Sequence, residues 1–477
     1  MKIKINQIKV KIFEFMYFNT NLSRFAPEHI LNKPVSFISL INLIFEGQER
    51  YTPPQINNIL NKIDRINLSF GKLVRWLIFP YILTTKYKDE LFLKNKKENK
   101  KSILVVARNI YPATIQKIKI LKDRYIIHFV NLYDPNDQLD INSYVDYYYK
   151  DVKDYPSLKQ VILNNNFDYI YILCWMWEYI LAKFCIKNKK KSKIICDFYD
   201  ITSVKGSKEN LKKNWNSLLV DIDYSCEKFI YINSNKIIHR FNENDFKKIV
   251  KDHFNIILSK PNLEFQQYPE IYPSEKNNFY KKNSSINLLY LGGLTPRNKN
   301  HVEGLFPLFR NLEAWELILS QKINIHFYMS FYRNLEEQGL SEYIKLKEKF
   351  KNLNFHKSLP LHEIYKIKDK FDYGFLISKI NMNKNLVTPY QFRAVGTKIF
   401  SYFDLELPVI MMENYTYQCE MIEENNIGIK VKTSEINNLE KKLKNVNYEK
   451  LKNSVLKFKE KNMLKKHSQR LLNFIER

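Results

Sequence analysis

Short apolar segments alternate with helical patterns along this chain, and the series occurs twice. In the first series a helix is expected at residues 111–121, and strands are expected at residues 103–107, 125–132, 169–173, 193–196 and 229–232. Apolar strands separated by helices are typical of a parallel sheet that is covered on both faces. We therefore predict an α/β domain over residues 101–273.

A polar segment at residues 274–285 interrupts this pattern and has the composition of an interdomain linker. The alternation then restarts, with strands expected at residues 286–291, 323–330, 354–356, 372–377 and 409–412 and helices at 341–350, 362–368 and 397–403. A chain of 477 residues can bury two sizeable cores. The predicted organisation is a partly helical N-terminal extension, two α/β domains and a C-terminal helical segment, at residues 1–100, 101–273, 286–448 and 449–477.

The chain is strongly basic, with 77 Lys and Arg against 50 Asp and Glu and a formal net charge of +27. Such a surface attracts polyanions, whether nucleic acid, anionic lipid or phosphorylated substrates. The lysines are spread along the whole chain, and no basic helix with interleaved aromatic residues is apparent. We therefore expect no nucleic-acid partner, and we interpret the lysine-rich residues 94–101 as a solvated linker.

Five widely spaced cysteines form neither a C-x-x-C pair nor a disulfide framework, which favours a reducing, cytoplasmic compartment. The N-terminus lacks the apolar core and cleavage site of a signal peptide. The apolar residues 73–83 contain Arg75 and Pro80 and are too short to span a bilayer. Either a core helix or a segment at a membrane interface fits this run, so peripheral association with the inner face of the membrane stays open.

The strand at residues 286–291 leads directly into Gly292 and Gly293, with Arg297 and Lys299 close behind. Two glycines at the end of a strand allow a ligand to approach the backbone closely, and the two basic side chains supply charge for phosphate oxygens. The pattern predicts a phosphate-binding turn. An ordinary turn is the alternative.

A second candidate segment starts at Gly396 and continues through Thr397 and Lys398 into a predicted helix. The N-terminus of a helix presents free N–H groups and positive dipole, which suits a diphosphate. Lys398 would add positive charge at the place where negative charge develops on a leaving group. The alternative is a surface helix with a solvated lysine.

These motifs together resemble the donor domain of the GT-B glycosyltransferases, particularly those of family 4. In that family a glycine turn with basic residues precedes a later motif of the form N-K-x-x-E-Y-x-x-x-G-x-P-V-I. The matching positions in this chain are Thr397, Lys398, Ser401, Tyr402, Glu406, Pro408, Val409 and Ile410. The resemblance implies a GT-B fold, with two Rossmann-like domains facing across a cleft, and a nucleotide-sugar donor held without a metal or other cofactor.

The chain departs from the family pattern at positions that bear on donor binding. Two glutamates that are usual in the family fall on Arg393 and Ser401, and the usual glycine is Glu406. A serine offers one oxygen to the ribose, whereas a carboxylate offers two. Ribose binding would therefore be weaker, unless Glu406 or Glu303 supplies the missing contact. Arg393 could bind a phosphate instead.

The resemblance is thinner in the first domain, where Asp200 follows an expected strand. A carboxylate at this place could orient the sugar or accept the proton of the acceptor, so Asp200 is the candidate catalytic base. A helix cap or a loop carboxylate is the competing interpretation. Asp221 and Asp223 are expected to be solvated, and no metal-binding signature is present.

The predicted function is a hexosyltransferase-like glycosyltransferase that moves a sugar from a nucleotide-diphosphate donor to a glycan or lipid-linked acceptor, in surface polysaccharide synthesis. The donor-binding candidates are Gly292, Gly293, Arg297, Lys299, Arg393, Thr397, Lys398 and Ser401. The expected partners are the donor, the acceptor and a membrane surface. The alternatives are a nucleotide-sugar epimerase and a catalytically silent GT-B binding protein.

Overall fold

The computed structural model describes residues 10–11, 13–15, 17–19, 23, 100–108, 110, 112–132, 141–213, 215–272, 285–294, 312–329, 341–377 and 393–477. These form two compact units: the first contains residues 1–203, 207–239 and 250–263, and the second contains residues 204–206, 240–249 and 264–477. The predictions for Arg297, Lys299, Glu303 and residues 73–83 lie outside the described residues.

The first unit is built on a seven-stranded sheet with the order β3-β2-β1-β4-β5-β6-β7. The pairs from β3 to β6 are parallel. Its strands are β1 (Lys101–Ala107), β2 (Tyr125–Asn131), β3 (Tyr147–Tyr148), β4 (Tyr169–Cys174), β5 (Lys193–Phe198), β6 (Lys236–His239) and β7 (Asn262–Glu264).

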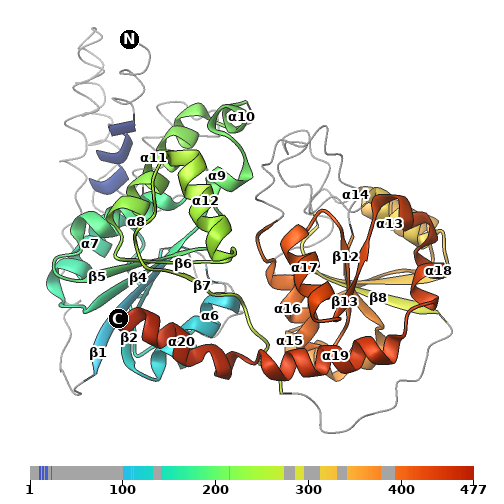
Figure 1. The fold of residues 1–477 in the computed structure, drawn as a ribbon. Coiled ribbons are helices and arrows are strands. Elements are labelled where there is room, and N and C mark those ends of the chain that lie inside the picture. Colours follow the sequence, from blue (N-terminus) through green and yellow to red (C-terminus); the bar gives the residue numbers. More distant parts are fainter. Residues whose placement is uncertain are drawn as a thin grey trace, which may run out of the picture. The chain divides into compact units, whose positions relative to one another are not determined.

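The helices lie on both faces of this sheet, because the strand order runs outward from β1 in two directions and right-handed crossovers then fall on opposite sides. Figure 1 shows α6 on one face and α8 and α11 on the other. The helices in this part of the chain are α6 (Pro112–Lys122), α7 (Tyr155–Asn164), α8 (Tyr179–Asn188), α9 (Thr202–Lys205), α10 (Lys208–Lys212), α11 (Ser217–Asn233) and α12 (Glu243–Phe254), of which α9 and α12 have residues in both units.

The strand expected at residues 229–232 is wrong, because this apolar run is the last turn of α11. Asp223, Cys226, Glu227 and Ile230 are buried at helical spacing along that helix, while Ile232 is 49% exposed. A short apolar run has no periodicity of its own, so the longer helical pattern decides its conformation. The strand follows as β6.

The described part of the N-terminal extension packs within the first unit. Phe13 and Tyr17 are buried, and the Tyr17 ring makes an edge contact with Tyr155 at 5.0 Å between centroids. The Tyr17 hydroxyl also accepts a hydrogen bond from buried Arg108, with 2.8 Å between the atoms. These residues therefore complete the core around α7.

The second unit is built on a six-stranded parallel sheet with the order β10-β9-β8-β11-β12-β13. Its strands are β8 (Ile286–Gly292), β9 (Ile323–Met329), β10 (Leu353–His356), β11 (Tyr373–Leu376), β12 (Val409–Met412) and β13 (Gly428–Val431). The five strands predicted in this part of the chain are confirmed. The sixth, β13, was not predicted.

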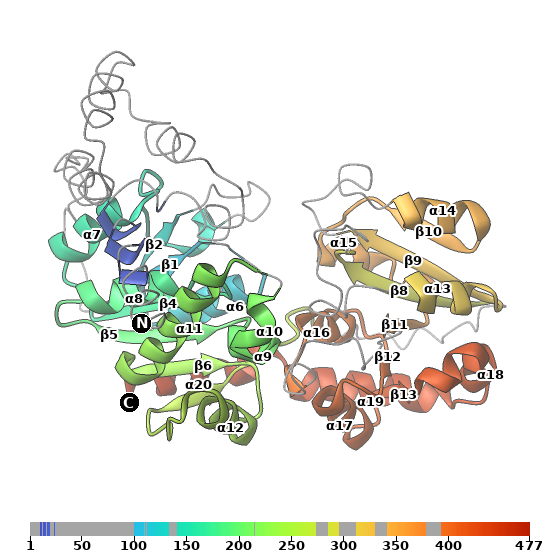
Figure 2. The ribbon, with the colours of Figure 1, turned by 90° about the horizontal axis from the view of Figure 1, so that it is seen from above.

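The helices of the second unit also cover both faces of the sheet. Figures 1 and 2 show α13 and α14 on one face and α16 and α17 on the other. The helices are α13 (Leu312–Leu319), α14 (Ser341–Lys349), α15 (Leu361–Lys366), α16 (Thr397–Asp404), α17 (Thr416–Glu424), α18 (Leu439–Lys444), α19 (Tyr448–Lys461) and α20 (Leu464–Glu476). The last two are the predicted C-terminal helices.

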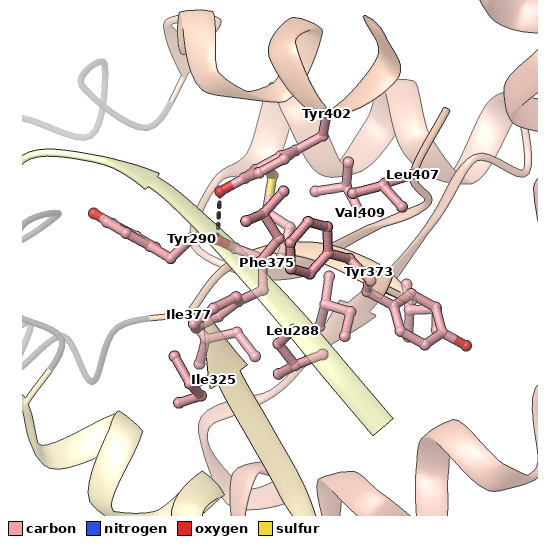
Figure 3. Packing of buried hydrophobic residues seen from close by; sticks show 14 of the residues in the cluster. Leu288, Tyr290, Ile325, Tyr373, Phe375, Ile377, Tyr402, Leu407 and Val409 are labelled. Atoms are coloured by element: carbon pink, nitrogen blue, oxygen red, sulfur yellow. Dashed lines mark hydrogen bonds between the residues drawn. The ribbon is translucent and has the colours of Figure 1, made fainter. Parts of the chain in front are cut away.

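Tyr402 fixes α16 on the sheet at the centre of this core (Figure 3). Its hydroxyl accepts from the Leu291 amide at 3.2 Å and donates to the Phe375 carbonyl at 3.2 Å. A Cβ added to Gly374 would lie 2.2 Å from the Tyr402 ring, so glycine is required for this close approach. Tyr402 follows Lys398 by four residues, one helical turn, so its anchoring also sets the position of Lys398.

In the part of the chain that the structure describes, no helix combines the length and apolar character needed to cross a bilayer.

Candidate functional site

Gly292 ends β8 in a conformation that favours glycine, with φ at +116°. A Cβ at this position would lie 2.5 Å from Cε of Lys398, so the absent side chain is what lets Lys398 lie over the turn. A Cβ at Gly293 would meet no described atom within 4 Å. The turn therefore brings backbone and ammonium together and leaves room beside Gly293.

Lys398 extends from the first turn of α16 to the end of β8. Its Nζ lies 3.4 Å from the Tyr290 hydroxyl and 5.1 Å from the centre of that ring. Burial lowers the pKa of Lys398 to about 8. An anion placed here would stabilise the protonated ammonium, because the surrounding protein solvates the charge poorly.

The N-terminus of α16 is capped by Gly396, which brings no side chain to the first-turn amides. Thr397 and Lys398 are the first two residues of the helix and are both partly exposed. The dipole of a helix favours an anion at its N-terminus. The structure thus brings Gly292, Gly293, Thr397 and Lys398 together in one candidate anion site.

Ser401 and Arg393 stand apart from this arrangement in different ways. Ser401 lies one turn further along α16 and is partly exposed. Arg393 forms ion pairs with Asp245, at 2.5 Å, and with Glu420, at 3.1 Å. Two carboxylates therefore compensate the Arg393 charge, and its predicted contact with a donor phosphate stays a prediction.

A polar network crosses the half of the second sheet formed by β8, β9 and β10. His326 Nδ1 lies 3.1 Å from His356 Nε2, and His326 Nε2 lies 3.3 Å from Asn287 Oδ1. Burial, reinforced by the neighbouring His356, lowers the pKa of His326 to about 4. The sequence analysis missed this network. Its signal was polar residues at every second strand position, including Asn324, His326, Asn354 and His356.

Asp200 lies in the loop between β5 and α9, at the carboxyl end of β5 as predicted. Buried side chains hold this loop. The Tyr179 hydroxyl lies 2.5 Å from the Asp200 carbonyl and 3.3 Å from the Thr202 amide, and the Ser203 amide donates to Glu227 at 3.1 Å. Tyr179 and Glu227 thus accept from first-turn amides of α9. This is the capping role that was the competing interpretation for Asp200.

The expectation that Asp221 and Asp223 are solvated is wrong. Asp221 is 7% exposed and pairs with Lys208 and Lys212, each at 2.7 Å. Asp223 is 2% exposed and accepts from the Trp177 amide at 3.0 Å. The Trp177 and Tyr179 amides over α11 need a buried acceptor, and Asp223 supplies it, whereas Asp221 is held by its two lysines. Among the described residues, no cluster of three or more His, Cys, Asp or Glu could hold a metal ion.

Comparison with known proteins bears on both units. Residues 319–474 match the family model for the glucosyltransferase 3-like C-terminal domain. HepE from Anabaena in complex with UDP-glucose aligns at 9% identity with a TM-score of 0.53, covering 78% of this chain and 99% of that one. OtsA in its apo form aligns at 10% identity with a TM-score of 0.51, covering 79% and 99%. The chain has the fold of the GT-B glycosyltransferases.

The predicted GT-B fold class is therefore confirmed, with one parallel sheet and its helices in each unit. The family 4 type stays a prediction. The N-terminal domain of the Candida albicans trehalose-6-phosphate phosphatase also aligns, at 11% identity with a TM-score of 0.50, covering 80% of this chain and 98% of that one. No curated protein sequence matches the chain.

Glu406 occupies the position where the GT-B family 4 motif usually has glycine, and it keeps the backbone conformation of a glycine, with φ at +60°. Its carboxylate is buried against Lys368, and it contacts Lys459 at 3.2 Å and the Tyr365 hydroxyl at 2.9 Å. The alternative that Glu406 binds the ribose is therefore wrong, because these partners hold its oxygens inside the domain.

Proposed function

We propose that this protein transfers a sugar from a nucleotide-diphosphate donor to a glycan or lipid-linked acceptor. The observation that carries this is Lys398, which lies over the Gly292 turn at the N-terminus of α16. A diphosphate needs a concentration of positive charge, and the Lys398 ammonium and the positive end of the α16 dipole supply it at this place. The match of residues 319–474 to a glucosyltransferase-like domain supports the same donor class.

In the proposed reaction, the bond between the anomeric carbon and the diphosphate oxygen breaks, and a bond from that carbon to an acceptor oxygen forms. Lys398 stabilises the charge that gathers on the departing nucleoside diphosphate. Asp200 in the first unit takes the proton that the acceptor hydroxyl loses. Arg297, Lys299, Arg393, Thr397 and Ser401 complete the proposed donor contacts.

The hexosyl donor, the surface-polysaccharide role and the cytoplasmic location with peripheral membrane contact are parts of the same proposal. The five described cysteines are all buried and free, which suits a reducing compartment. Residues 73–83 supply the proposed membrane contact.

A screen of UDP-, GDP- and ADP-sugars should release nucleoside diphosphate from one donor when sugar acceptors are present. Nucleotide release is measured for the wild type and for Lys441→Ala, which removes an exposed lysine on α18 and should behave as the wild type. Conversion of the donor sugar without release would indicate an epimerase. Binding of nucleotide with neither release nor conversion would indicate a silent binding protein and contradict the proposal.

The affinity for UDP should fall as pH rises above about 8, because the pKa of Lys398 is lowered to about 8 and the ammonium deprotonates there. Below that pH the lysine is charged, so affinity should be nearly constant from about pH 7 to 8 and then fall up to about tenfold per pH unit. Calorimetric titration measures the profile. In Lys398→Arg the guanidinium stays charged and the fall should disappear. An identical fall in both proteins would contradict the assignment.

A further inference from the structure

Two aromatic rings stack at the carboxyl end of the first sheet. Trp175 directly follows β4 and Tyr199 directly follows β5. The register pairs Cys174 with Phe198, so the next residue on each strand falls side by side. The ring centroids of Trp175 and Tyr199 are 4.3 Å apart with 30° between the planes, and both residues are partly exposed.

The turn that carries Trp175 is strained and firmly held. Trp177 has φ at +72°, a left-handed conformation that is strained for a residue with a bulky side chain. Its amide donates to buried Asp223 at 3.0 Å, and its ring packs on Trp215 with centroids 4.6 Å apart. Strain of this kind persists where surrounding contacts over-determine it, and it concentrates at functional sites.

Tyr199 is also held in place by its neighbours in sequence. It precedes Asp200, whose loop is anchored by Tyr179 and Glu227. The stacked pair is therefore partly exposed next to a carboxylate, on a loop that hydrogen bonds hold in place. Buried core aromatics would need neither the strained turn nor the partial exposure.

A pyranose ring has an apolar face of C–H groups and a rim of hydroxyls. The apolar face stacks on an aromatic ring, and a rim hydroxyl donates to a carboxylate. A neutral sugar with such a C–H face therefore fits this place better than an anion, which the Asp200 carboxylate would repel. The chemistry of the three side chains selects a neutral saccharide.

We propose that the stacked pair of Trp175 and Tyr199 forms an aromatic platform for the acceptor, with a neutral pyranose ring against the exposed part of the pair and one hydroxyl directed to Asp200. That the bound sugar is the acceptor rests on the proposed function. The acceptor is then recognised by its terminal sugar, whether that sugar belongs to a free glycan or is linked to a lipid.

The test is saturation-transfer difference NMR of the full-length protein, without donor, with a panel of methyl pyranosides and disaccharides. At least one neutral saccharide should bind the wild type, and Trp175→Ala should weaken its binding about tenfold or more. Tyr199→Leu should weaken it as well, whereas Trp175→Phe should retain most of it. Tyr272→Ala is the matched control, because Tyr272 is 66% exposed and lies outside the platform.

Equal saccharide binding by the wild type, Trp175→Ala and Tyr199→Leu would overturn the platform, as would the absence of binding across the panel. Thermal melting checks that each variant is folded. If Trp175→Ala does not fold, the saccharide binding of Tyr199→Leu tests the platform. Calorimetric titration with UDP, GDP and ADP on the same samples separates the two proposals. If the variants lose saccharide binding and the wild type binds neither UDP nor GDP nor ADP, the platform stands and the proposed donor class is contradicted.

Discussion

Replacing Lys398 by alanine should lower kcat/KM for the nucleotide-sugar donor by about 10²- to 10³-fold, the loss expected when one preorganised charge is removed from a developing anion. Lys398 is held over Gly292 by the fold and lies 3.4 Å from the Tyr290 hydroxyl, so little reorganisation is needed when the diphosphate departs. The measurement is steady-state release of nucleoside diphosphate from the donor found by the screen.

The controls separate the charge from its position. Lys441→Ala, on an exposed face of α18, should leave kcat/KM unchanged. Gly292→Ala keeps the ammonium but places a Cβ 2.5 Å from Lys398 Cε, so it should displace the lysine and reproduce much of the loss. A Lys398→Ala enzyme that is folded and turns over donor at the wild-type rate would refute the assignment of this lysine to the leaving group.

Glu406→Gln should destabilise the second unit by about 3–5 kcal/mol, the usual cost of removing one partner from a buried ion pair. Burial opposes ionisation of Glu406, but the lysine charges outweigh it and lower its pKa to about 2. Lys459 is fully buried and Lys368 nearly so, and the substitution removes the carboxylate that both contact. Hydrogen exchange of peptides from α16 and α19 measures the local free energy of opening.

Glu424→Gln provides the matched control, because Glu424 is exposed at the end of α17 and its change should stay within about 0.5 kcal/mol. Combining Glu406→Leu with Lys368→Met and Lys459→Met should restore much of the lost stability, since apolar replacement of a whole buried ionic cluster is often neutral. Exchange rates in Glu406→Gln equal to those of the wild type would show that the carboxylate is not needed there.

Local patterns were sufficient for most of the second sheet. Residues 409–412 were predicted as a strand and form β12 with the same bounds, because Pro408 separates this short apolar run from the helical pattern before it. The run at 229–232 failed for the opposite reason, since the helix that absorbs it is recognised only over many residues.

The candidate site shows the same division. The sequence predicted that Gly292 and Lys398 bind the same phosphate-bearing donor, but not that a side chain at 292 would collide with the lysine. The sequence also could not predict the burial that lowers the Lys398 pKa, because desolvation depends on neighbours that are distant along the chain.

By itself, the sequence determined the class of fold, the positions of most strands along the chain and the glycine turn with its helix, because these depend on local periodicity and backbone freedom. Only the tertiary structure decided which charges are already paired. It placed Glu406 against two lysines, gave Arg393 two carboxylates and buried Asp223 under the Trp177 turn. A charge finds its partner across the fold, so residue type alone cannot separate a side chain that holds the structure from one that meets a substrate.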